Sequence, residues 1–131
     1  MCTLAELEEA IRESWGPDTA DPDDGWSAEI PSRGHCDITS LVVHDLLGGE
    51  FLTTDVYLDS ERIMAHTWNR LESGIEIDLT RDQFTSGEVF GEPTARPRPA
   101  TSVLADTSHP RYERYQQYLV LEARVRTRLG V

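Results

Sequence analysis

With 131 residues and a formal net charge of −12, the chain is long enough for one domain with a buried core, and its charge disfavours nucleic acid as a partner. The sequence contains no lysine, which excludes a lysine nucleophile or Schiff base. It shows no signal-peptide pattern at its start and no run of roughly 18 apolar residues. We therefore expect one cytoplasmic domain over residues 1–131, without membrane association and with reduced cysteines.

The first part of the chain predicts two helices separated by a long loop. Thr3 and Glu6 fit a capping box, and apolar residues follow at helical spacing on one face: Leu4, Leu7, Ile11 and Trp15. Residues 16–34 are rich in Asp, Pro and Gly, which is typical of a functional loop. The second helix is expected from near Cys36 to Gly48, and it is apolar around most of its circumference. A helix of this kind is buried at the centre of a domain.

The second half of the chain predicts a small sheet and a final helix. Residues 50–58, 62–71 and 75–79 have the composition of strands, and residues 80–83 form one helical turn. Prolines predict irregular structure over residues 85–108. The last helix is expected over residues 110–129, with core contacts at Tyr112, Tyr115, Leu119 and Val125. The fold class is therefore α+β, with a central helix packed on an antiparallel sheet.

Cys36 is the first candidate for chemistry because it lies at the expected start of the central helix. The unpaired N–H groups at such a position lower a thiol pKa, and they can bind the oxyanion formed in acyl transfer. A free cysteine on a buried helix is, however, more often a small core residue. Cys36 alone does not decide between these two interpretations.

His66 and Asp78 lie on neighbouring predicted strands, and the hairpin register decides whether they meet. A three-residue loop at residues 72–74 pairs Leu71 with Ile75, so that Trp68 opposes Asp78 and His66 is its diagonal neighbour on the same face. In this register Ile75, Ile77 and Leu79 face the core. A two-residue loop would place His66 and Asp78 on opposite faces. His66 by itself could equally be a structural histidine.

The three residues occur in the papain-type order: a cysteine at a helix start, a histidine on a strand and an aspartate on the next strand. This chemistry needs a base for the thiol and a carboxylate that holds the imidazole tautomer. The sequence therefore suggests a catalytic triad with Cys36 as nucleophile, His66 as base and acid, and Asp78 as the residue that orients His66.

Three segments resemble the bacterial YunG family: residues 33–49 around Cys36, residues 66–71 and residues 76–84. The resemblance covers about residues 12–84 well and the last helix loosely. It implies a reduced papain-like fold, with the family's Cys, His and Asp at Cys36, His66 and Asp78. Relatives carry Gln where His35 stands and Tyr where Thr67 stands. If that Gln assists the oxyanion hole, His35 must replace it as a donor or the hole is weaker.

Other residues are weaker candidates. His35 and Asn69 are expected to support the site, and Trp26 and Trp68 to line a substrate cleft, although tryptophans more often serve the core. A metal site is disfavoured because Cys36, His35 and His44 lack a second cluster at structural-zinc spacing. No cofactor is required.

The sequence predicts a cysteine-dependent hydrolase or acyltransferase that acts on an amide or thioester through an acyl-enzyme on Cys36. Its partner would be a small-molecule or peptide substrate, or an acyl group bound to a carrier. The alternative is a non-catalytic binding module that keeps the papain-like fold and binds a peptide without cutting it.

Overall fold

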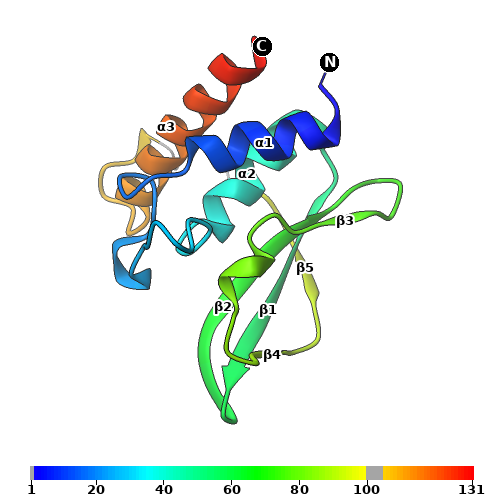
Figure 1. The fold of residues 1–131 in the computed structure, drawn as a ribbon, viewed down its shortest axis with the longest axis vertical. Helices are drawn as coiled ribbons and strands as arrows, with labels where there is room; N and C mark the ends of the chain where they lie inside the picture. Colours follow the sequence, from blue (N-terminus) through cyan, green and yellow to red (C-terminus); the bar gives the residue numbers. More distant parts are fainter. Residues whose placement is uncertain (1, 100–104) are drawn as a thin grey trace.

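The computed structural model describes residues 2–99 and 105–131 and has an α+β fold. Figure 1 shows the helices gathered at one end and a long β-hairpin reaching away from them. None of the helices in the described residues is long and apolar enough to span a membrane. The elements are α1 (Leu4–Ser14), η1 (Pro22–Asp24), α2 (Cys36–Leu47), β1 (Glu50–Leu58), β2 (Glu61–Arg70), β3 (Glu76–Ile77), η2 (Arg81–Gln83), β4 (Val89–Phe90), β5 (Thr94–Arg96) and α3 (Tyr112–Leu129).

The core lies between the three helices and the start of β1. The predicted capping box is present, because Thr3 and Glu6 exchange hydrogen bonds at the start of α1. Two of the predicted core residues are wrong: Leu4 is 47% exposed and Leu119 is 40% exposed. Helix α3 buries Tyr115 and Val125 as predicted, together with Tyr118 and Leu121. The core includes Leu7, Ile11, Ile38, Val42, Phe51, Tyr115, Tyr118, Leu121 and Val125.

The sheet has two more strands than the sequence predicts. Its order is β3-β2-β1-β4, and β5 also pairs with β1. The prediction of irregular structure over residues 85–108 is therefore wrong for β4 and β5, and its residues 100–104 lie outside the described part of the chain. The prolines do not interrupt β5, because Pro93 precedes it and Pro97 follows it. The long edge of β1 supplies the hydrogen-bonding partner that these short segments need.

The register of the β2–β3 hairpin agrees with the three-residue loop. Asn69 pairs with Ile77, and the Leu71 N–H donates to the Ile75 carbonyl at 2.8 Å. Trp68 therefore opposes Asp78. Ile77 is buried as expected, but Ile75 is 58% exposed because it lies at the tip of the hairpin beyond the core.

The two faces of β2 have different neighbours. On one face the Asn69 side chain donates to the Ser40 carbonyl of α2, and its cross-strand partner Phe51 belongs to the helical core. Since side chains alternate along a strand, His66 and Trp68 extend from the opposite face. There the His66 ring contacts Phe84 and Phe90.

The loop between α1 and α2 is held by a buried arginine from α3. Arg114 is 5% exposed and donates to the Thr19 carbonyl at 2.6 Å and to the Gly34 carbonyl at 2.5 Å. It also binds both carboxylate oxygens of Asp37, at 2.7 and 2.9 Å. One guanidinium therefore fixes both the loop and the first turn of α2.

His35 is buried in the same region, immediately before α2. Its ring Nε2 lies 2.8 Å from the Thr19 hydroxyl, and the ring stacks on Trp15 with centroids 5.3 Å apart. Burial, and then the nearby positive charge of Arg114, lower the pKa of His35 to about 4. The imidazole is therefore neutral in the folded protein at neutral pH.

We expect Arg114→Met to lower the free energy of unfolding by about 3 kcal/mol, since it leaves the Asp37 carboxylate and two carbonyls with fewer donors. Arg124→Met is the matched control, because Arg124 lies on the same helix and pairs with Asp18 at an exposed position, where the loss is about 0–1 kcal/mol. Urea unfolding of both variants measures the difference. Equal losses would contradict a clamping role for Arg114.

We expect His35 to make the fold sensitive to acid. The unfolded chain protonates this histidine near its ordinary pKa of 6.5, whereas the folded protein resists protonation down to about 4. Stability is therefore complete above that ordinary pKa and falls by about 3 kcal/mol as the pH decreases to about 4. Chemical denaturation across this range should show a weaker pH dependence in His35→Gln than in the parent. His109→Gln serves as the control and should keep the parent's dependence.

Candidate functional site

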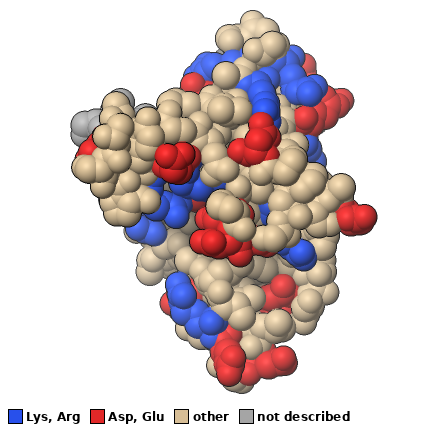
Figure 2. Space-filling model, turned by 90° about the vertical axis from the view of Figure 1, so that its left-hand side faces the viewer, with Lys and Arg blue, Asp and Glu red and all other residues tan. Residues whose placement is uncertain are grey.

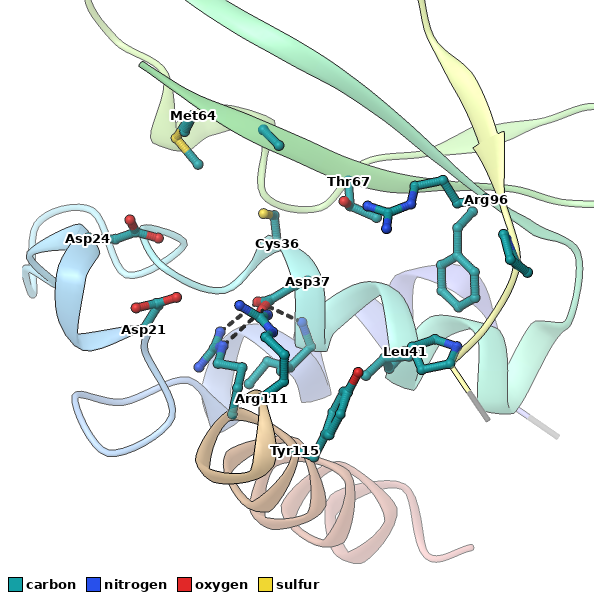
Figure 3. A pocket seen from close by; sticks show the side chains of 16 residues that line it. Asp21, Asp24, Cys36, Asp37, Leu41, Met64, Thr67, Arg96, Arg111 and Tyr115 are labelled. Atoms are coloured by element: carbon teal, nitrogen blue, oxygen red, sulfur yellow. Dashed lines mark hydrogen bonds and ion pairs between the residues drawn. The ribbon is translucent and has the colours of Figure 1, made fainter. Parts of the chain in front are cut away.

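Cys36 is the first residue of α2, where the sequence placed it. Its side chain is 9% exposed and lines a cavity of about 520 Å³ between α2, β2, the η1 segment, β5 and the start of α3. Figure 3 shows the thiol between Asp24 on one side and Thr67 on the other. The thiol is thus buried, yet it borders a space large enough for a small ligand.

The expected lowering of the thiol pKa is wrong in this structure. Burial, followed by the negative charge of Asp37, raises the pKa of Cys36 to about 12. The Thr67 backbone N–H faces the sulfur and acts in the opposite direction, but it is outweighed. A carboxylate directly after the cysteine opposes the positive end of the helix dipole. In the resting site Cys36 is therefore a neutral thiol.

His66 and Asp78 form a hydrogen-bonded pair on the other face of β2. The His66 Nε2 and Asp78 Oδ2 atoms are 2.7 Å apart, and the His66 side chain is fully buried. Arg81 donates from Nε to the same Asp78 oxygen at 2.7 Å. Burial alone would raise the pKa of Asp78, but the hydrogen bond and charge of His66, together with those of Arg81, lower it below its ordinary value.

The second nitrogen of His66 has a different environment. Nδ1 is buried and has no hydrogen-bond partner among the described residues. Aromatic rings surround the imidazole: Trp68 stacks on it at 5.5 Å between centroids, and the edges of Phe84 and Phe90 meet it. Buried polar atoms are normally paired, so an unpaired ring nitrogen needs an explanation.

Helix α2 meets β2 close to His66. The Ser40 hydroxyl donates to the Thr67 carbonyl at 3.2 Å, and the Cys36 sulfur faces the Thr67 N–H. Cys36 therefore lies beside the peptide group that joins His66 to Thr67. No hydrogen bond links the sulfur to the imidazole within the residues described here. The structure thus joins His66 to Asp78, whereas Cys36 borders a cavity that neither His66 nor Asp78 lines.

The two supporting candidates have structural positions. The His35 ring is held by Thr19 at Nε2 and by Trp15, while its buried Nδ1 has no hydrogen-bond partner among the described residues, and a donor role toward an oxyanion stays a prediction. Asn69 is 2% exposed and donates from Nδ2 to the Ser40 carbonyl at 3.0 Å. Asn69 supports the site by attaching α2 to β2.

The expectation that two tryptophans line the cleft is wrong. Trp26 donates its indole N–H to the Pro31 carbonyl within the loop, and Trp68 donates to Glu76 on the His66 face of the sheet. Neither residue borders the cavity. The cavity wall also includes four residues that the sequence did not assign to the site, because an Asp-rich loop and an Arg-Pro segment are weak signals: Asp21, Asp24, Arg96 and Pro97.

Charges of both signs lie around this part of the molecule. Figure 2 shows acidic and basic side chains interspersed on one face, in spite of the net charge of −12. In the described residues, no group of three or more His, Cys, Asp or Glu side chains is arranged to hold a metal ion. The site is therefore described by its thiol, its imidazole–carboxylate pair and its charged cavity wall.

Comparison with known proteins identifies a family for this chain, but it finds no matching solved structure. A protein from Bacillus subtilis (strain 168), described as an uncharacterized protein YunG, is 27% identical over 115 residues, which cover 87% of this chain and 89% of that protein. No solved structure matches the chain. The family model described as YunG protein matches residues 3–130, which is nearly the whole chain. The chain therefore belongs to the YunG family.

Proposed function

We propose that this protein is a cysteine-dependent hydrolase or acyltransferase of the papain-like type, acting on an amide or thioester. The observation that carries the proposal is the His66–Asp78 pair, whose imidazole keeps one buried nitrogen without a partner. A carboxylate on one ring nitrogen fixes the tautomer and leaves the other nitrogen for proton transfer. Cys36 lies beside the peptide group that joins His66 to Thr67 and borders a cavity, which supports its assignment as the nucleophile.

The reaction follows from these roles. Cys36 attacks the carbonyl carbon of the substrate while His66 removes the thiol proton, and a carbon–sulfur bond forms. The backbone N–H groups at the start of α2, which have no partner within the helix, stabilise the oxyanion. The bond to the leaving nitrogen or sulfur then breaks, and His66 returns the proton to the leaving group. Water or an acceptor amine attacks the acyl-enzyme, releases the acyl group and restores the thiol. No cofactor takes part.

The raised pKa of Cys36 sets the order of events. A neutral thiol must lose its proton during attack, rather than exist as a thiolate beforehand. In the structure His66 is enclosed by Trp68, Phe84 and Phe90 on the face of β2 opposite α2, so the step needs a rearrangement on substrate binding that brings its free ring nitrogen to the sulfur. Active-site hydrogen bonds are commonly long without substrate and tighten in the complex.

The same observation favours a second candidate function. A buried, neutral thiol beside Asp37 suits a non-catalytic module that binds a peptide or small molecule in the cavity. The two functions differ in one result, which is whether an acyl group is transferred to Cys36.

We expect Cys36 to become acylated when the protein is incubated with an activated acetyl ester or an acetyl thioester. Intact-mass spectrometry with peptide mapping should locate one acetyl group at Cys36. Cys2→Ser, the matched control, should keep this adduct and Cys36→Ser should lose it. A folded protein that stays unmodified with both donors, or is modified equally at both cysteines, would support the binding module instead.

We expect Asp78→Asn to slow acylation of Cys36 by roughly 10–10³-fold, because the amide can present its N–H to the ring and favour the wrong imidazole tautomer. The comparison is with Glu76→Gln, which alters a carboxylate two residues away that binds the Trp68 indole. Acylation rates and melting temperatures are measured on the same samples. If Asp78→Asn lowers the melting temperature but leaves the acylation rate unchanged, Asp78 has a structural role alone.

A further inference from the structure

The cavity beside Cys36 carries opposite charges at its two ends. Asp21 and Asp24, in and next to the η1 segment, lie at one end, and Arg96 of β5 lies at the other (Figure 3). Cys36 and Thr67 lie between them. These charged groups come from loop and edge-strand segments, whereas the thiol comes from the buried helix.

The charges at both ends lack partners in the protein. Among the described residues, the side chains of Asp24 and Arg96 form no hydrogen bond or ion pair, and the Asp21 carboxylate accepts a single hydrogen bond, from the Asp23 backbone N–H. Asp37 differs, because Arg111 and Arg114 bind its carboxylate. Burial, and then the neighbouring charges of Asp21 and Asp37, raise the pKa of Asp24, so a cation placed there would relieve an unfavourable environment.

The wall between the two ends combines the ion-paired Asp37, Arg111 and Arg114 with an apolar part. Side chains from α2, β1 and α3 form the apolar part: Ile38, Leu41, Phe51 and Tyr115. Ligand sites of this size are typically apolar with a few placed polar groups that fix the orientation of the ligand. The cavity therefore offers a cation site, an apolar wall and an anion site, with the thiol of Cys36 between the charged ends.

We infer that this cavity recognises a short zwitterionic peptide, with its ammonium group at Asp21 and Asp24 and its carboxylate group at Arg96. The inference rests on the proposed function for its chemistry, since the peptide bond would be the amide that Cys36 attacks. Recognition of the two charged ends of the peptide is separate from the chemistry at Cys36, so binding measurements can test it without turnover.

The experiment is calorimetric titration of the Cys36→Ser protein with leucyl-leucine and trileucine, each compared with its N-acetylated and C-amidated forms. We expect at least one of the two free peptides to bind. Blocking either end should weaken its affinity about 10-fold, because each cap removes a charge-assisted hydrogen bond. Asp24→Asn should abolish the effect of N-acetylation, and Arg96→Gln should abolish the effect of amidation.

Matched controls separate these effects from a general change of charge. Asp23→Asn alters an exposed carboxylate of η1 that does not border the cavity, and Arg62→Gln alters an exposed arginine of β2. Both should keep the parent's sensitivity to the two caps. Binding of neither peptide, or equal binding of free and capped forms, would overturn the inference and leave acylation of Cys36 untouched. Charge-dependent binding by a protein whose Cys36 is never acylated would uphold this recognition and overturn the proposed chemistry.

Discussion

The guanidinium of Arg114 is the interaction on which the site depends. It satisfies the Thr19 and Gly34 carbonyls of a long loop and binds the carboxylate of Asp37 in the first turn of α2. A buried arginine is stable because every charge and carbonyl around it is paired, and removing one member leaves the others unsatisfied. Through these bonds helix α3 determines where the loop ends and where α2 begins. The position of the Cys36 thiol follows from that junction.

The same ion pair shapes the chemistry of the thiol. Asp37 is needed to bind Arg114, yet its negative charge lies next to the sulfur and disfavours a thiolate. Asp37 therefore has two opposing effects: it anchors Arg114, and it disfavours the thiolate form of Cys36. The proposed chemistry therefore assigns removal of the thiol proton to a base at the moment of attack, and it gives this role to His66, whose other ring nitrogen is bound by Asp78.

Local sequence patterns predicted the parts of the fold that local forces determine. The capping box at Thr3, the start of α2 at Cys36 and the three-residue hairpin loop before Ile75 follow from hydrogen bonding and turn geometry within a few residues. The meeting of His66 with Asp78 could be derived because it depends on that hairpin register alone. Strands β4 and β5 could not, since two or three residues form a strand only where a long neighbouring edge is available.

The cavity and its charges could not be predicted from the sequence either, because they also depend on tertiary packing. Asp24 and Arg96 are 72 positions apart in numbering, and only the packed fold brings both to one cavity. Trp26 and Trp68 were wrongly predicted to line the cleft. A large aromatic side chain indicates burial, but it does not indicate which part of the structure the side chain packs against. The pKa of Cys36 was misjudged because the helix terminus was considered without the burial that accompanies it and without the charge of Asp37.

The clamp made by Arg114 also has a consequence for biosynthesis. Its bond to Asp37 spans 77 residues, and the ribosome makes the chain from the N-terminal end. The loop and α2 therefore leave the ribosome well before the arginine that fixes them. Until this part of the chain arrives, Asp37 lacks the two arginines that bind its carboxylate, and the Gly34 carbonyl has the Asp21 N–H but not Arg114 as a donor, so the thiol region is completed last. A nascent chain that stalls before α3 carries a cysteine that is not yet enclosed in its final surroundings.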